Sequence, residues 1–311
     1  MSEASRRRTA GVLVVDKPQG PTSHDVVARV RRALGTREVG HAGTLDPMAT
    51  GVLVVAVGEA TKLVPWLTAA RKHYRTTLAL GVETDTLDAM GRVTRSVAVG
   101  DDLRAELARG IQPGLLAEAL RGERARTAQV PPAFSAVHTG GERAYDRARR
   151  GESVVLEPRE VAVFELALVA CSPDPPSVTL DVEASKGFYV RSLARDLAAS
   201  LGTVGHLTAL RRTRSGTFDA EGAVLLSASP EELASRLVHL ADAAARVLPV
   251  ARLTEAGADH ARNGRRVPAA EIECASADLP SAWLDPTGAL VAVGEVDGAG
   301  NGRVVRGFAR G

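Results

Sequence analysis

The residues best suited to catalysis lie in one glycine-rich segment, where Asp46 is followed by a proline and His41 lies shortly before it. A fixed, ionised carboxylate can act as a covalent catalyst or stabilise a developing positive charge. Taken alone, an aspartate before proline is a common turn initiator, and a loop histidine is commonly a surface residue. Here, however, glycines from Gly40 to Gly51 bracket Asp46, and apolar runs lie on either side. Loops held between rigid elements in this way are favoured sites of function, so Asp46 is the leading catalytic candidate.

The spacing of the residues excludes several other kinds of catalytic or cofactor site. Ser23, His24 and Asp25 have the letters of a catalytic triad, but adjacent residues cannot form the hydrogen-bonded line that a triad needs. The glycine-rich stretches match neither the phosphate-binding GxxxxGK[ST] pattern nor a dinucleotide-binding GxGxxG that opens a helix. The two cysteines, Cys171 and Cys274, lie far apart and form no metal-ligand pattern. We therefore expect no cofactor, no metal and no disulfide framework.

The composition indicates an ordinary globular protein. The chain has 311 residues, which suggests two domains, and 45% of them are hydrophobic. The net charge of +2 is nearly neutral, but 186–216 holds six lysines and arginines against one acid, and 271–300 holds six acids and no lysine or arginine. The chain can therefore present a basic surface to a polyanion even though its overall net charge is nearly neutral. No signal peptide and no apolar run of membrane-spanning length is evident, so we expect a cytoplasmic protein without membrane contact.

The elements that must position Asp46 begin with a strand at 11–15 and a helix capped by Ser23 and stopped by Gly35. Periodicity and turn residues predict further strands at 52–57, 73–80, 161–169, 177–184, 289–296 and 303–308. Helices are predicted over 103–126 with an interruption at 110–114, from 190 to 201, and over 231–247.

Two further expectations concern segments between these elements. Paired prolines exclude a helix at 129–135, which should be extended and exposed at the surface. We expect a disordered basic arm at 1–10, a catalytic domain at 11–247 and a small C-terminal domain at 248–311.

The Asp46 loop resembles, almost letter for letter, the catalytic loop of the bacterial tRNA pseudouridine synthase B family, in which a GHxGxLDPxAxG stretch holds the nucleophilic aspartate. Other blocks match this family in the same order along the chain: 11–20, 58–62, 72–74, 81–88, 129–136, 185–191 and 210–212. All four lysines of the chain, Lys17, Lys62, Lys72 and Lys186, fall within these blocks.

The resemblance implies an α+β fold: a mixed, mostly antiparallel sheet with flanking helices, followed by a small C-terminal PUA-like β domain that binds RNA. It implies isomerisation of uridine to pseudouridine at position 55 in the TΨC loop of tRNA, on a base flipped out of the RNA stack. This reaction breaks the N1–C1′ bond and rejoins the base through C5, without redox chemistry. The absence of a cofactor motif agrees with it.

The resemblance also assigns the catalytic residues. Asp46 would be the nucleophile, and Arg191 the cation that offsets the lost hydration of its carboxylate. Tyr74 resembles the active-site tyrosine that stacks against the target base and is a candidate for moving a proton at the sugar. Sequence alone leaves open whether Asp46 attacks C1′, adds to C6 of the base, or assists elimination through a glycal.

Other residues would bind the substrate. His41 resembles the residue inserted where the base leaves the stack, Tyr189 a second pocket tyrosine, and Leu210 the apolar residue beneath the base. Contacts to RNA phosphates should come from arginines. The candidates are Arg143, Arg147, Arg149, Arg150, Arg211, Arg212 and Arg214.

The expected partner is the TΨC stem-loop of tRNA, bound by a monomer without an obligate protein partner. Two alternatives stay open at this point. One is a related synthase acting on another RNA, such as rRNA within a ribonucleoprotein, and the other is an RNA-folding chaperone that uses the same face.

Overall fold

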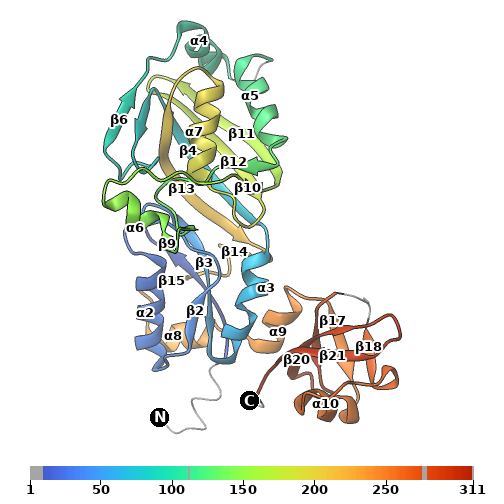
Figure 1. The fold of residues 1–311 in the computed structure, drawn as a ribbon. Helices are drawn as coiled ribbons and strands as arrows, with labels where there is room; N and C mark the ends of the chain where they lie inside the picture. Colours follow the sequence, from blue (N-terminus) through green and yellow to red (C-terminus); the bar gives the residue numbers. More distant parts are fainter. Residues whose placement is uncertain (1–9, 111–112, 275–278, 310–311) are drawn as a thin grey trace. The chain divides into compact units, whose positions relative to one another are not determined.

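The computed structural model describes residues 10–110, 113–274 and 279–309, and the chain divides into two compact units. The central unit consists of Asp46–Gly51 and Arg71–Ser215, and the terminal unit of Met1–Leu45, Val52–Ala70 and Gly216–Gly311. Figure 1 shows the helices and strands of each unit, coloured along the sequence. Of the arm predicted at 1–10, all but the last residue lies outside the described residues. The boundary predicted between 247 and 248 stays a prediction.

The sheet of the central unit is built mainly from four antiparallel strands. Their order is β11 (Val163–Pro173), β12 (Pro176–Ala184), β4 (Lys72–Leu80) and β13 (Gly205–Ser215). β13 also pairs in parallel with the first residues of β3 (Thr50–Val57), which places Arg212 opposite Gly51. The strands predicted at 73–80, 161–169 and 177–184 are confirmed as β4, β11 and β12. In β12, alternate residues such as Leu180 and Val182 are fully buried.

Helices cover this sheet (Figure 1). α4 (Asp101–Arg109) and α5 (Leu115–Arg124) are separate helices, as the glycines between them predict. α7 (Val190–Ser200) buries Leu193, Ala194 and Leu197. A side chain on Gly205 would meet Ala198 of α7 at 2.9 Å, so α7 packs closely on the face of β13 that carries Gly205. Because Gly205 pairs with Leu80, alternation along β4 puts Tyr74 on this same face.

Short elements complete the central unit. α6 (Ala144–Arg149) follows a two-stranded ribbon of β8 (His138–Thr139) and β9 (Glu142–Arg143). Two other strand pairs are β5 (Val82–Thr84) with β6 (Val93–Ser96), and β7 (Ala128–Gln129) with β10 (Arg159–Glu160).

The first part of the terminal unit contains β1 (Gly11–Lys17), α2 (Ser23–Leu34), β2 (Val39–His41) and the rest of β3. Thr22, and not the predicted Ser23, caps α2, because its side chain and that of Asp25 form a reciprocal capping box. Gly35 ends the helix in the left-handed conformation, as predicted. β3 leads into the 3-10 helix η1 (Gly58–Leu63) and α3 (Val64–Ala69).

The remainder of this unit begins after β13. The helix predicted over 231–247 is wrong as one element: α8 (Pro230–Ser235) and α9 (Leu240–Ala245) are separated by β16 (Val238–His239), which pairs with β1. Pairing with β1 outweighs the helical pattern of this segment. The short strands β14 (Phe218–Asp219) and β15 (Val224–Leu225) precede α8, and β15 lies parallel to β1.

A five-stranded sheet closes the chain and confirms the expected β-rich C-terminal part. Its order is β18 (Ile272–Cys274), β17 (Val250–Leu253), β19 (Ser281–Leu284), β20 (Leu290–Val296) and β21 (Gly302–Gly307). α10 (Glu255–Arg262) and η2 (Ala269–Glu271) accompany it. Trp283 is fully buried in its core, and Phe308 packs in the cluster that also holds Val12 and Val54. Within the described ranges, no helix has the length and apolarity needed to cross a membrane.

Candidate active site

The guanidinium of Arg191 contacts both oxygens of the Asp46 carboxylate. Nε lies 2.8 Å from Oδ2, and Nη2 donates to Oδ1 at 3.2 Å. The arginine side chain is 6% exposed and the aspartate side chain 33% exposed. Two-point contacts of this kind between arginine and carboxylate fix the plane of both groups. The site therefore holds the Asp46 carboxylate in a defined orientation while leaving a third of its side chain exposed.

Backbone carbonyls fix the other side of the guanidinium. Nη1 of Arg191 donates to the carbonyl of Thr86 (3.0 Å), and Nη2 donates to the carbonyl of Phe134 (2.9 Å). Asp88 shapes the first of these loops, because its Oδ1 accepts hydrogen bonds from the Thr86 hydroxyl (2.7 Å) and the Met90 N–H (3.0 Å). These contacts orient a buried cation whose charge Asp46 balances.

The Asp46 loop is held at its C-terminal end within the central unit. The carbonyl of Asp46 accepts the N–H of Ala49 at 3.0 Å, which closes a turn. Thr50 and Gly51 then join β13. Gly51 has φ +98°, and a Cβ there would lie 2.2 Å from the carbonyl oxygen of Arg212. Only glycine fits this close backbone approach, which explains the glycine that ends the motif.

The residue just before Asp46 is held by a contact that sequence reasoning missed. The Ser23 hydroxyl donates to the Leu45 carbonyl at 3.1 Å and accepts the Leu45 N–H at 2.9 Å. The sequence marked Ser23 as a helix cap, and its position beside Thr22 gave no signal of this long-range bond. Ser23 instead fixes the chain just before the Asp46 loop.

Tyr189 stands at the entry to α7, two residues before Arg191. It is the N-cap of the helix, with extended backbone angles (φ −110°, ψ 113°). Burial raises the pKa of its hydroxyl, and the charges of Arg191 and Asp46 also act on it. The hydroxyl is therefore neutral at physiological pH and lies within electrostatic reach of the pair. Tyr189 is thus extended, whereas Arg191 lies in the first turn of the helix.

Tyr74 and Leu210 share one face of the central sheet. Tyr74 pairs with Arg212 of β13, and Leu210 pairs with Thr76 of β4, so the two are diagonal neighbours on that face. Leu210 is 7% exposed, and its carbonyl accepts the hydroxyl of Thr50, from the Asp46 loop, at 3.5 Å. The sheet thus brings an apolar side chain and a half-buried tyrosine to the face on which α7 packs.

A buried lysine lies on this face as well. Lys72 is two residues from Tyr74 on β4 and is 6% exposed. Burial, with the positive charges of Arg212 and Lys186, lowers its pKa to about 8. The sequence placed Lys72 in a family block, but a lysine in a strand pattern gave no sign of its burial.

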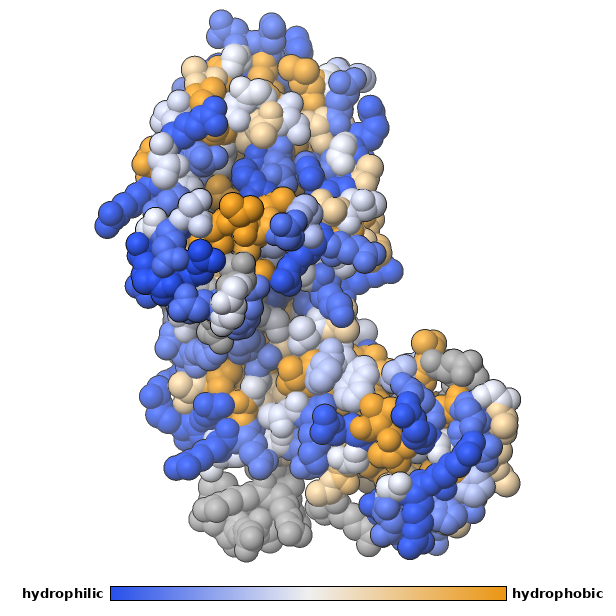
Figure 2. Space-filling model, viewed as in Figure 1, coloured by the Kyte–Doolittle hydropathy of each residue, from blue (hydrophilic) through white to orange (hydrophobic). Residues whose placement is uncertain are grey.

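The proposed RNA-contacting arginines differ in their surroundings. A phosphate contact requires an arginine at the surface. Arg212 is only 1% exposed, because it lies on the same inward face of β13 as Leu210, so it does not meet this requirement. Arg147 and Arg150 both contact Glu152, Arg214 contacts Glu183, and Arg149 lies over the ring of Tyr145. The side chain of Arg143 lies outside the described residues. Figure 2 shows a mostly hydrophilic face with separate hydrophobic patches.

His41 belongs to the terminal unit. It ends β2, and its ring meets that of His24 edge-on, with centroids 5.4 Å apart. Its role at the flipped base stays a prediction. In the part of the chain that the structure describes, no group of three His, Cys, Asp or Glu side chains is arranged to hold a metal ion.

The family comparisons match nearly the whole of this site. Residues 31–190 match the family model described as TruB family pseudouridylate synthase (N terminal domain). Residues 191–246 match the tRNA pseudouridylate synthase B C-terminal domain. The chain belongs to the TruB family of pseudouridylate synthases. It is therefore a pseudouridine synthase, an isomerase, as the sequence blocks predicted. Asp46 and Tyr74 fall in the first TruB match, and Arg191 and Leu210 in the second.

Curated relatives cover most of the chain. A protein named tRNA pseudouridine synthase B from Arthrobacter sp. is 43% identical over 292 residues, which is 91% of this chain and 92% of the relative. A protein of the same name from Thermobifida fusca is 48% identical over 265 residues, covering 83% of this chain and 86% of the relative.

A solved structure supports the fold. The structure described as a Cbf5-Nop10-Gar1 complex matches with a TM-score of 0.72 at 24% identity, covering 97% of this chain and 85% of that chain. The α+β pseudouridine synthase fold is thereby confirmed for this TruB-family chain.

Proposed function

We propose that this protein isomerises uridine to pseudouridine at position 55 in the TΨC loop of tRNA. The observation that carries the proposal is the two-point contact between Arg191 and the Asp46 carboxylate, in the loop that matches the family's catalytic motif. An ionised, oriented and partly exposed carboxylate is what nucleophilic catalysis at a sugar or base requires. Curated relatives that are named for tRNA support tRNA as the substrate class.

The reaction conserves every atom of the uridine. The N1–C1′ bond breaks, the base turns over, and a C5–C1′ bond forms, while C5 loses a proton and N1 gains one. Asp46 acts as the nucleophile in this scheme, and attack at C1′, addition at C6 and elimination through a glycal all require its ionised form. Arg191 meets this carboxylate with a positive charge and with hydrogen bonds to both of its oxygens.

Other side chains bind the extruded base in this proposal. Tyr74 stacks against the base and, in the glycal route, removes the C2′ proton. Tyr189 and Leu210 form the walls of the pocket, and the apolar side chain of Leu210 packs beneath the base. His41 occupies the place from which the base has left, which offsets part of the few kcal/mol that unstacking costs.

The exposed arginines contact phosphates, together with the β-rich C-terminal part. The protein acts as a cytoplasmic monomer on tRNA without an obligate protein partner. An RNA-folding chaperone is the second candidate, because RNA binding alone would use the same face. The oriented Asp46 favours the enzyme, since a chaperone has no need of a buried arginine fixed against a carboxylate.

The test compares wild type with Asp46→Asn on tRNA transcripts that carry tritium at uridine C5. Wild type should release tritium from a normal transcript and release much less from one in which uridine 55 is replaced by cytidine. Asp46→Asn should retain less than about a thousandth of the turnover while still binding tRNA. Asp102→Asn, at the exposed start of α4, is the control and should keep full turnover. Turnover in Asp46→Asn above that level would overturn the nucleophile assignment, and modification elsewhere would overturn the substrate site.

A deuterium at C2′ tests the proton role of Tyr74. Where chemistry limits the rate, removal of the C2′ proton should slow the deuterated substrate. An unchanged rate would count against that role while leaving Asp46 as the nucleophile.

A further inference from the structure

Gln129 binds the backbone of Tyr189 at two points. Its Nε2 donates to the Tyr189 carbonyl at 3.2 Å, and its Oε1 accepts the Tyr189 N–H at 2.9 Å. Gln129 is 2% exposed, so water does not compete for these bonds. The side-chain amide therefore pairs with Tyr189 as a neighbouring strand would, from 60 residues away in the sequence.

The bound residue is the one at which the chain enters α7. The carbonyl of Tyr189 also accepts the N–H of Leu193 at 3.1 Å, the first bond of the helix. Fixing both polar groups of this N-cap fixes the direction in which the helix starts. Arg191 is the second residue of that helix, so its Cα position follows from the same contact.

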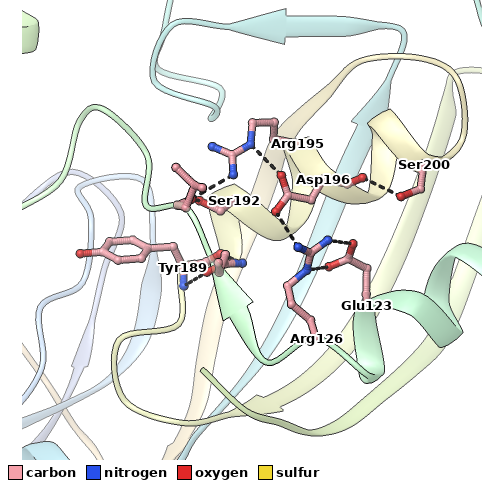
Figure 3. Close-up of polar contacts among 9 residues, drawn as sticks. Glu123, Arg126, Tyr189, Ser192, Arg195, Asp196 and Ser200 are labelled. Atoms are coloured by element: carbon pink, nitrogen blue, oxygen red, sulfur yellow. Dashed lines mark hydrogen bonds and ion pairs between the residues drawn. The ribbon is translucent and has the colours of Figure 1, made fainter. Parts of the chain in front are cut away.

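The residue after Gln129 is held on α7 as well. The carbonyl of Val130 accepts the Ser192 hydroxyl at 2.9 Å and Nη2 of Arg195 at 3.0 Å. Nε of Arg195 contacts Asp196 at 2.8 Å, and Asp196 lies 3.7 Å from Arg126 (Figure 3). These bonds hold Gln129 and Val130 along the first turns of the helix.

This placement reaches the catalytic pair directly. Phe134, in the same segment, supplies a carbonyl to Nη2 of Arg191, the nitrogen that also donates to Asp46. Gln129 thus acts on Arg191 from two sides: through the helix start that carries it, and through the segment that supplies its carbonyl partner.

We propose that Gln129 is a positioning residue for the isomerisation, which holds Tyr189 and the Phe134 segment so that Arg191 meets Asp46 in its reactive orientation. The proposal rests on the roles given above to Asp46 and Arg191. Gln129 touches neither the substrate nor the reacting atoms. Its contribution is the alignment of the pair, and a misplacement of about 1 Å in an active site can lower a rate by about a hundredfold.

The first test is Gln129→Met, which keeps the length of the side chain and removes both hydrogen bonds. We expect kcat to fall by about tenfold or more while KM for tRNA changes by less than about threefold, because alignment and not binding is lost. Ser200→Ala is the matched control: it removes a hydroxyl that bonds to Asp196 at the exposed end of α7, and it should retain wild-type kcat.

The second test is Gln129→Glu, whose effect depends on pH. The neutral acid has the shape of glutamine and can donate to the Tyr189 carbonyl while accepting its N–H. The ionised form cannot donate and faces that carbonyl with a negative charge. The ratio of variant to wild-type kcat should therefore rise as the pH falls from about 7.5 to about 5.5, since burial raises the pKa of a carboxyl.

Ala199→Glu adds the same carboxyl at an exposed position of α7 and should show a flat ratio. A wild-type kcat in Gln129→Met, or a flat ratio in Gln129→Glu, would overturn the proposal. If Gln129→Met fails to fold, the pH ratio of Gln129→Glu decides by itself. A wild type that formed no pseudouridine in tRNA would instead refute the proposed function, so the two failures are distinguishable.

Discussion

Arg191 lies behind Asp46, with its side chain 6% exposed while that of Asp46 is 33% exposed. The guanidinium uses two nitrogens for the carboxylate and shares its other hydrogen bonds with the carbonyls of Thr86 and Phe134. The buried member of the pair is therefore fixed by the protein on all sides. The exposed member takes its orientation from the buried one and keeps a third of its side chain exposed.

Replacing Arg191 with lysine should show that the planar guanidinium, and not the positive charge alone, is needed. A lysine cannot contact both carboxylate oxygens and both carbonyls from one planar group. We expect kcat to fall by about a hundredfold, and the free energy of unfolding by about 1–3 kcal/mol as buried carbonyls lose their donors. Tritium release and urea unfolding measure the two effects.

Arg75→Lys is the matched control for that change. Arg75 also contacts an aspartate, Asp181, through two nitrogens, but its side chain is 58% exposed. Exposed pairs of this kind contribute about 0–1 kcal/mol, so both measurements should stay close to wild type. Equal activity in the two lysine variants would contradict the role given to Arg191.

Gly51→Ala should destabilise the protein at the end of the catalytic loop. The backbone of Gly51 has φ +98°, and the added methyl would lie 2.2 Å from the carbonyl oxygen of Arg212. The strained conformation and the clash together should lower the free energy of unfolding by about 2–4 kcal/mol. Gly122→Ala, in α5, meets nothing within 4 Å and should instead stabilise by about 0.5–1 kcal/mol. Urea unfolding measures both variants. Equal changes in the free energy of unfolding for Gly51→Ala and Gly122→Ala would contradict this prediction.

The sequence predicted local features well, because they depend on neighbouring residues. The alternation in β12, the glycine that stops α2 and the break between α4 and α5 all follow from patterns within a few positions. Asp46 was singled out from the sequence in the same way, since glycines and apolar runs around one acid are a local signal, and its catalytic role stays a prediction. The expected reaction came from the sequence motifs that resemble those of the family.

The features that were missed depend on residues far apart in the chain. The segment at 129–135 was predicted to be exposed, because paired prolines are typical of surface loops, yet Gln129 and Ser135 are buried. The carbonyls of Val130 and Phe134 find their donors on α7, which no local pattern reveals. Arg212 was predicted to contact phosphate because of its charge. It lies two residues from Leu210 on β13, so the alternation of the strand puts both side chains on the same inward face. Gln129 carried no signal beyond its place in a family block.

The burial of Lys72 predicts how stability depends on pH. Its pKa in the folded protein is about 8, because burial and two nearby cations disfavour the charged form, whereas an unfolded lysine titrates near its usual 10.5. Above pH 8 the folded state loses this proton while the unfolded state keeps it, so the unfolded state binds more protons and the free energy of unfolding rises with pH. Each unit of such a shift corresponds to about 1.4 kcal/mol, so the rise between about pH 8 and 9.5 should be measurable by urea unfolding. Lys72→Met should lack this rise. Lys62→Met, which removes a part-exposed lysine paired with Glu59, should keep it. A wild type whose stability stayed level or fell across this range would show that Lys72 titrates like an exposed lysine.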